Sequence, residues 1–135
     1  MPKFTYLAHN GIVTANPDKM LRFYKQQLGF KEVSRVIITQ KIMKQIFSFP
    51  YECEMIKLRQ GDSYLELFCA KEKYVTKKNT NTLGYNHWGY FVEDKHKFCR
   101  KLEKRGISFI KVKRDKGMAY FIKDPDSNRI EIMER

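Results

Sequence analysis

The chain has 135 residues, of which 42% are hydrophobic, 14% aromatic and 31% charged. A chain of this length and apolar content folds as one ordinary globular unit or as two small modules, and it lies well outside the composition of disordered proteins. The longest stretches without a charged residue have fourteen residues, and the one at 79–92 is rich in Asn and Thr. A membrane-spanning helix is therefore excluded.

The cysteines and the first residues indicate the compartment. Cys53, Cys69 and Cys99 are an odd number of cysteines with no C-x-x-C spacing, which is typical of reduced thiols. Residues 1–4 lack the apolar core and the small-residue cleavage site of a secretory signal. We therefore expect a cytoplasmic protein with no membrane partner.

The charge is strongly basic and unevenly spread. The formal net charge is +12, and the segment 95–116 carries ten basic residues against two acidic ones. Such a field attracts phosphates and other anions, and it would favour an anionic small-molecule substrate. Nucleic acid is a less favoured partner, because no helix-turn-helix, zinc-finger or RNP-type signature accompanies the charge. A solvated, lysine-rich surface is the simplest interpretation.

The first half of the chain begins with a strand and a helix. Residues 4–13 form a predicted strand, and a helix starts at Pro17, because proline suits the first turn and Asn16 or a neighbour can cap it. Apolar residues recur at helical spacing until Gly29, which ends the helix. Four strands are then predicted, at 30–38, 45–49, 54–58 and 64–69.

The segment 40–51 makes the first half longer than the second and is rich in apolar side chains. An insertion of this kind is more often core packing or a dimer contact than the wall of a substrate site. The segment 71–83 is polar and carries two Asn-Thr pairs, so we expect it to be a linker.

The second half repeats the order of the first. A strand is predicted at 85–92, followed by a helix that Asp94 caps and Gly106 ends. Three strands follow, at 107–112, 118–122 and 129–133.

The two halves are repeats of the same structural unit. The distance from His9 to Gly29 is 20 residues, the distance from His87 to Gly106 is 19, and each half ends in an alternating strand with a central glutamate. Apart from the additional strand at 45–49, which lies in the longer segment of the first half, each half therefore has the order β-α-β-β-β, and the fold class is α+β. The predicted boundaries are a first module at 1–70, the linker at 71–83 and a second module at 84–135.

Four polar residues occupy matched places in the two units, namely His9 and His87 in the first strands and Glu66 and Glu131 in the last strands. Each has a simpler explanation when taken alone. A strand glutamate between aliphatic neighbours usually faces solvent, and a lone strand histidine usually bonds a backbone carbonyl. Their matched placement favours a joint role, because two imidazoles and two carboxylates are a coherent ligand set for a divalent metal ion.

Two segments carry a resemblance to a known family. One runs from His9-Asn10-Gly11-Ile12-Val13 to Leu28-Gly29-Phe30, and the other contains Asp124-Pro125-Asp126-Ser127-Asn128-Arg129-Ile130-Glu131. Over essentially its whole length the chain resembles the vicinal oxygen chelate superfamily of glyoxalases, bleomycin-resistance proteins and extradiol dioxygenases, which usually has Gly at the position of Ser127. The resemblance implies two βαβββ modules whose curved mixed sheets form an open cup around a metal ion. The residues at its ligand positions are His9, Glu66, His87 and Glu131.

Departures from the family's patterns narrow the chemistry. Phe121 stands where extradiol dioxygenases have a tyrosine, so ring cleavage is not expected. The ligand set is closest to that of proteins similar to glyoxalase I (lactoylglutathione lyase), but Val13 and Ala70 stand where glyoxalase I binds glutathione. The resemblance therefore implies a metal-dependent lyase or isomerase that moves a proton in a small carbonyl compound through an enediolate, with Glu66 and Glu131 as the catalytic groups.

The resemblance also implies a cofactor and a partner. The expected cofactor is zinc or nickel, with iron, manganese or cobalt as alternatives. The expected partner is a second copy of the chain, in a homodimer. The main alternative function is non-catalytic binding of a small drug or metabolite, and thiol transfer of the fosfomycin-resistance type is a further alternative.

Overall fold

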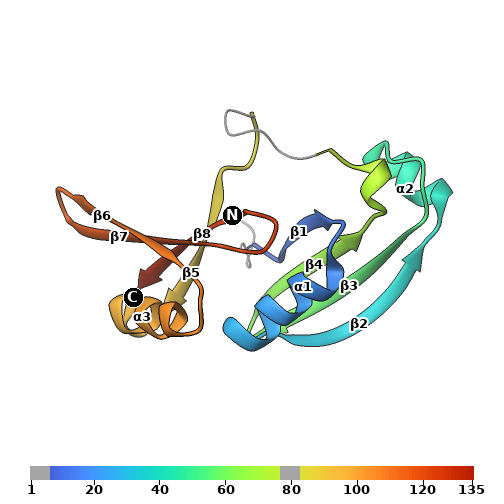
Figure 1. Cartoon of the computed structure of the whole chain (residues 1–135). Coiled ribbons are helices and arrows are strands. Elements are labelled where there is room, and N and C mark those ends of the chain that lie inside the picture. Colours follow the sequence, from blue (N-terminus) through green and yellow to red (C-terminus); the bar gives the residue numbers. More distant parts are fainter. Residues whose placement is uncertain (1–6, 77–82) are drawn as a thin grey trace, which may run out of the picture. The chain divides into compact units, whose positions relative to one another are not determined.

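The computed structural model of the chain describes residues 7–76 and 83–135. These residues form two compact units, one on each side of the gap at 77–82 (Figure 1). Part of the strand predicted at 4–13, part of the predicted linker and the boundary at 83–84 therefore lie at or outside the limits of the described residues. Among the described residues, no helix has the length and apolar content needed to span a membrane.

The first unit is a four-stranded mixed sheet in the order β1-β4-β3-β2. Its strands are β1 (His9–Thr14), β2 (Lys31–Ile38), β3 (Cys53–Gln60) and β4 (Ser63–Cys69). The first and last strands pair in parallel, and the other pairs are antiparallel. The helical segments are α1 (Pro17–Arg22), the π-helical turn η1 (Phe23–Gln27), α2 (Gln40–Phe47) and the 3₁₀ turn η2 (Glu72–Tyr74).

The second unit repeats this topology in the order β5-β8-β7-β6. It consists of β5 (His87–Val92), α3 (Lys95–Lys104), β6 (Phe109–Arg114), β7 (Gly117–Lys123) and β8 (Arg129–Glu134). The pairing of β5 with β8 is again parallel. The α+β fold of two βαβββ modules with mixed sheets is confirmed.

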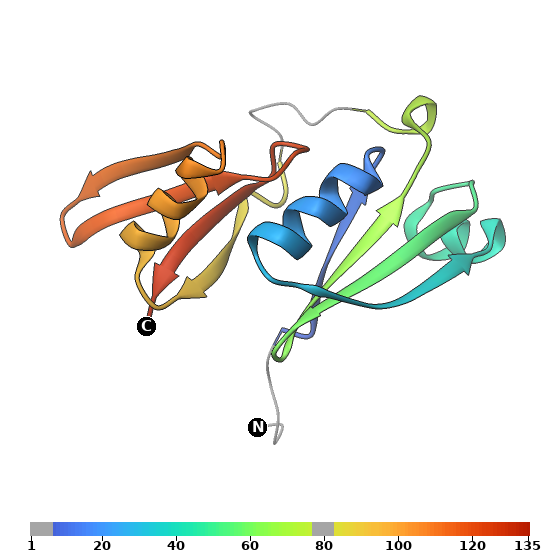
Figure 2. The same cartoon turned by 60° about the horizontal axis from the view of Figure 1, so that its bottom comes forward.

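One helix covers one face of each sheet (Figure 2). In the first unit, Met20 and Tyr24 are fully buried, and so are Ile56 and Leu67 of the sheet. In the second unit, α3 buries Cys99 and Leu102 together with the aliphatic residues of β7 and β8. Each unit therefore has its own apolar core under the helix that follows its first strand. On the opposite face of the first sheet, Met43 of α2 packs against Phe68 and Cys53.

The C-terminal ends of the two main helices and the start of α3 follow the predicted chemistry. Asn16 stands at the N-cap position of α1, as predicted, but makes no side-chain capping hydrogen bond. Gly29 has φ +79° and Gly106 has φ +85°, the left-handed backbone that glycine adopts without strain. The Asp94 carboxylate accepts a hydrogen bond from the Lys97 amide at 2.8 Å, which confirms it as the cap of α3.

The strand predicted at 45–49 is wrong, because residues 45–47 belong to α2 and Ser48 caps the end of that helix. Its apolar residues recur at helical rather than strand spacing, and the Thr39 hydroxyl caps the helix by accepting from the Ile42 amide. Met43 packs in a buried cluster with Cys53 and Phe68. Core packing is therefore confirmed for part of the insertion.

A hairpin turn leads into β8 and is held by hydrogen bonds within the turn. Asp124 is buried, and its Oδ1 accepts from the amides of Asp126 and Asn128 at 3.0 and 2.9 Å. Ser127 has φ +69°, a left-handed conformation that disfavours any residue with a Cβ.

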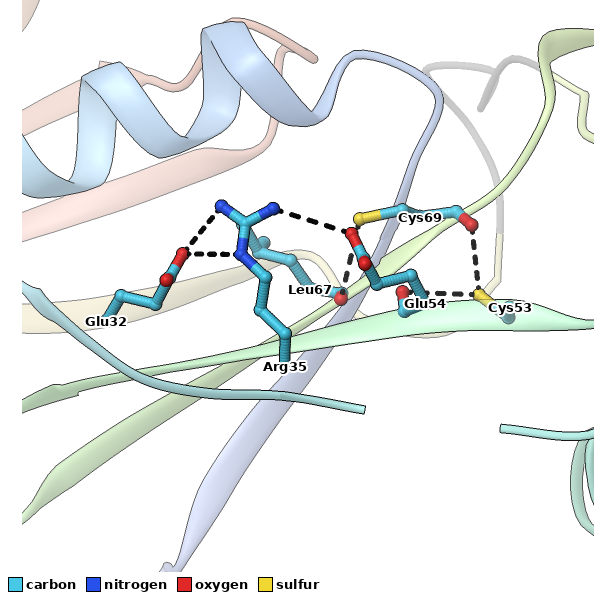
Figure 3. Close-up of polar contacts among 6 residues, drawn as sticks. All are labelled: Glu32, Arg35, Cys53, Glu54, Leu67 and Cys69. Carbon is cyan, nitrogen blue, oxygen red and sulfur yellow. Dashed lines mark hydrogen bonds and ion pairs between the residues drawn. The ribbon is translucent and has the colours of Figure 1, made fainter. Parts of the chain in front are cut away.

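A chain of ion pairs lies beside two of the cysteines in the first unit (Figure 3). Arg35 contacts Glu32 at 2.7 Å and Glu54 at 3.6 Å. The hydrogen bond from Arg35 lowers the pKa of Glu32 and raises the pKa of Arg35 itself. The Cys53 thiol donates to the Cys69 carbonyl at 3.1 Å. Burial raises the pKa of Cys53, and it raises the pKa of Cys69 and that of Cys99 to about 11.

Ser127→Gly should stabilise the protein by about 1 kcal/mol, because it removes the strain of a Cβ at positive φ. Urea unfolding measures this gain. Ser63→Gly, in a strand, is the matched control and should lower the free energy of unfolding. Equal changes in the free energy of unfolding for the two variants would show that Ser127 is not strained.

The thiols should be unreactive in the folded protein. A raised pKa keeps a thiol protonated, so at pH 8 the thiolate fraction of Cys69 and Cys99 falls and Ellman's reagent reacts ~100-fold more slowly than with a free thiol. All three cysteines should react at once in urea. Rapid reaction of two or more thiols in the native protein would contradict this prediction.

Candidate functional site

Parallel pairing brings His9 and Glu66 together in the first unit. Gly11 of β1 lies opposite Glu66 of β4, so His9, two residues before Gly11, points to the same sheet face as the carboxylate. His9 Nε2 lies 3.0 Å from Glu66 Oε1. The glutamate side chain is 12% exposed and the histidine 51%. This carboxylate therefore does not face bulk solvent.

The second unit repeats the arrangement with His87 and Glu131. Gly89 lies opposite Glu131, and His87 Nε2 lies 3.6 Å from Glu131 Oε2. The Glu131 side chain is 13% exposed. His87 Nδ1 lies 2.8 Å from Asn86 Oδ1. A proton on Nδ1, donated to Asn86, leaves the Nε2 lone pair available, as metal ligation requires.

We call the sheet face that carries each pair the histidine face. In both units a glycine follows the histidine by two residues, and an apolar side chain follows the glutamate by two. A Cβ on Gly11 would lie 3.3 Å from the Phe68 ring, and one on Gly89 would lie 3.0 Å from Met133 Sδ. The glycines therefore make room for an apolar group next to each carboxylate.

Arg114 distinguishes the two pairs. Its Nη2 donates to Glu131 Oε1 at 3.0 Å, so one oxygen of this carboxylate faces His87 and the other a guanidinium. Sequence reasoning counted Arg114 only as part of the basic segment 95–116. The alternation of apolar residues along β6 places Ile110, Val112 and Arg114 on one face, and this could have revealed it.

The structure therefore brings the four predicted site residues together as two pairs, each within its own unit. Groups of three or more His, Cys, Asp or Glu side chains suited to a metal ion do not occur among residues 7–76 and 83–135. His96, the remaining histidine, lies in α3 and contacts the Tyr120 hydroxyl at 3.0 Å. The ligand set of four stays a prediction.

The chain was compared with known families and solved structures. Residues 6–132 match the Glyoxalase/Bleomycin resistance protein/Dioxygenase superfamily. A glyoxalase family protein from Enterococcus faecalis is similar, with a TM-score of 0.77 and 22% identity over 96% of this chain and 97% of that one.

Two further structures have the same fold. A trypanothione-dependent glyoxalase I from Leishmania major has a TM-score of 0.73 and 20% identity over 97% of this chain and 87% of that one. An antibiotic-binding protein from a Streptomyces species has a TM-score of 0.65 and 14% identity over 99% and 98%. The family match over nearly the whole length and the duplicated βαβββ fold agree, and the chain belongs to the Glyoxalase/Bleomycin resistance protein/Dioxygenase superfamily.

Proposed function

We propose that the protein is a divalent-metal-dependent, glyoxalase-like lyase or isomerase that transfers a proton between adjacent carbons of a small carbonyl compound. The observation that carries this proposal is the repeated pairing of an imidazole nitrogen with a carboxylate oxygen, at 3.0 Å for His9 and Glu66 and 3.6 Å for His87 and Glu131. The three reduced cysteines are consistent with the cytoplasmic location that we also propose.

The donor chemistry fits a divalent metal ion. Two imidazole nitrogens and two carboxylate oxygens suit zinc or nickel, and also iron, manganese or cobalt. A resident ion in a catalytic site usually has three or four protein ligands, so we propose that one ion takes both pairs, His9 with Glu66 and His87 with Glu131. When bound, such an ion polarises carbonyl oxygens as a Lewis acid.

The protein side chains have two roles, metal binding and proton transfer. His9 and His87 hold the cofactor, and the two glutamates are the groups that remove and return the proton. Glu131 Oε1 already accepts from Arg114. Glu66 Oε2 makes no hydrogen bond or ion pair with the part of the chain that the structure describes, so it is the oxygen most available to a substrate C–H.

A second candidate function is binding of a small drug or metabolite without turnover. The specific observation in its favour is the ion pair between Arg114 and Glu131, which engages one of the four proposed ligands. In that function a ligand stabilises the protein by mass action, and a chelator leaves this effect unchanged.

Elemental mass spectrometry of the purified protein should find about one divalent ion per site, lost in His9→Ala and in Glu131→Ala. His96→Ala, which removes the histidine of α3, is the matched control and should keep the ion. Glu131→Gln should abolish turnover of 2-oxo hemithioacetals or acyl-coenzyme A thioesters and leave the circular dichroism spectrum unchanged. Absence of any ion after incubation with zinc, nickel, manganese and iron would overturn the proposal.

Arg114→Gln should bind zinc up to about fivefold more tightly than the wild type, the equivalent of ~1 kcal/mol for a largely exposed ion pair. The reason is that the guanidinium competes for Glu131 Oε1 and adds a positive charge beside the proposed ion. Arg100→Gln, which breaks a surface pair with Glu103, removes the same charge and should change nothing. Weaker zinc binding by Arg114→Gln would show that the guanidinium does not compete with the ion for Glu131.

Mixed dimers test the proposed homodimer and the origin of the two pairs. One chain carries His9→Ala and Glu66→Ala, and the other carries His87→Ala and Glu131→Ala. Each double variant lacks one complete pair. Metal binding that returns on mixing would show that one site draws its pairs from two copies, and no return would assign both pairs to the same chain.

A further inference from the structure

Two cations and a proposed ligand share one row of the second sheet. Lys123 of β7 lies opposite Arg129 of β8, and Arg129 lies opposite His87 of β5. Residues opposite one another in neighbouring strands point to the same face, so all three lie on the histidine face. Opposite side chains in an antiparallel pair have Cβ atoms about 5 Å apart, and like charges at such positions repel each other.

No acidic side chain among the described residues pairs with these two cations to offset their repulsion. The side chains of Lys123 and Arg129 make no hydrogen bond or ion pair with any described residue, whereas the Arg114 side chain pairs with Glu131. The matching row of the first unit holds Tyr64 and Arg59, where Arg59 donates to the Gly61 carbonyl at 2.7 Å and lies over the Tyr64 ring. The uncompensated pair is therefore specific to the second unit.

A cavity of about 250 Å³ lies at this pair. Its lining residues are Asn86, Ile110, Phe121, Ile122, Lys123 and Arg129. The cavity adjoins His87, a proposed metal ligand. The centroids of the Phe121 and His87 rings are 5.3 Å apart, and Asn86 Oδ1 lies 2.8 Å from His87 Nδ1. The wall of this space is largely apolar, so Lys123 and Arg129 contribute mainly the aliphatic parts of their side chains to it. Its size suits a fragment smaller than a drug.

We propose that this cavity binds the anionic end of the substrate, with a carboxylate or phosphate group on Lys123 and Arg129 and the adjacent apolar carbons on Ile110 and Phe121. A guanidinium binds such groups in bidentate fashion, and the anion cancels the repulsion between the two cations. The inference rests on the proposed function and names its substrate class, an anionic carbonyl compound with an apolar skeleton. The two cations, Lys123 and Arg129, lie outside the basic segment 95–116.

The test uses metal-stripped protein, dialysed free of chelator, and two probes of the same shape. Calorimetry should show that 3-phenylpropionate binds about tenfold more tightly than neutral 3-phenylpropionamide, with an affinity that falls as salt rises. Phenyl phosphate is the second anion. Tighter binding of the phosphate assigns a phosphate group, and tighter binding of the acid assigns a carboxylate.

Lys123→Gln and Arg129→Gln should each reduce the preference for the anion severalfold, and the double variant should bind acid and amide equally. Lys113→Gln is the matched control, because Lys113 alternates with Val112 and Arg114 in β6 and lies on the other face. Lys123→Gln should unfold at the wild-type temperature or above, since it relieves repulsion. A double variant that keeps the preference, or equal binding of both probes by the wild type, would overturn the proposal.

These outcomes are separate from those of the proposed function. The test measures the binding of the probes and not their turnover, and no metal is present in the assay. Anion preference in a protein that never retains a metal would overturn the proposed enzyme function and support the anion site. A metal-loaded, active enzyme without anion preference would support the enzyme function and overturn the anion site.

Discussion

The parallel pairing of the first strand with the last is the constraint on which each unit depends. It sets Gly11 opposite Glu66 and Gly89 opposite Glu131, so in both units the histidine two residues earlier shares a face with the carboxylate. A shift of one residue in β4 or β8 would turn Glu66 or Glu131 toward the face that the helix covers. The same pairing closes the sheet over the apolar core, so the stability of the unit and the position of its polar pair have one cause.

Much of the fold could be predicted because the chain contains the same unit twice. The matched spacing from His to Gly and the terminal strands with a central glutamate gave the βαβββ order, and positive φ at Gly29 and Gly106 explains why the helices end there. The segment 40–51 has no counterpart in the second unit, so the repeat could not guide its assignment. A short apolar run is ambiguous between strand and helix, and Thr39 supplied the deciding cap.

The candidate site was predictable in its residue types and less so in its surroundings. Matched positions singled out the two histidines and two glutamates, but contacts between strands that are distant in sequence depend on register. Arg114 reaches Glu131 from the far end of a hairpin, and Arg129 stands between Lys123 and His87 across three strands. These neighbours set the charge around Glu131 and His87 and, in our proposal, the substrate preference. A single sequence records none of the pairings that create them.

The strand order also bears on how the chain folds during synthesis. In each unit the strand made last, β4 or β8, is inserted between strands made earlier and pairs on both sides. The last three strands of each sheet are neighbours in chain order and can add one after another, but the first strand pairs only with the last, so each sheet is completed in a late, non-local step. The first sheet is complete once Cys69 has left the ribosome, about half a chain length before Glu134 completes the second. The earlier unit can thus fold while its copy is still being translated.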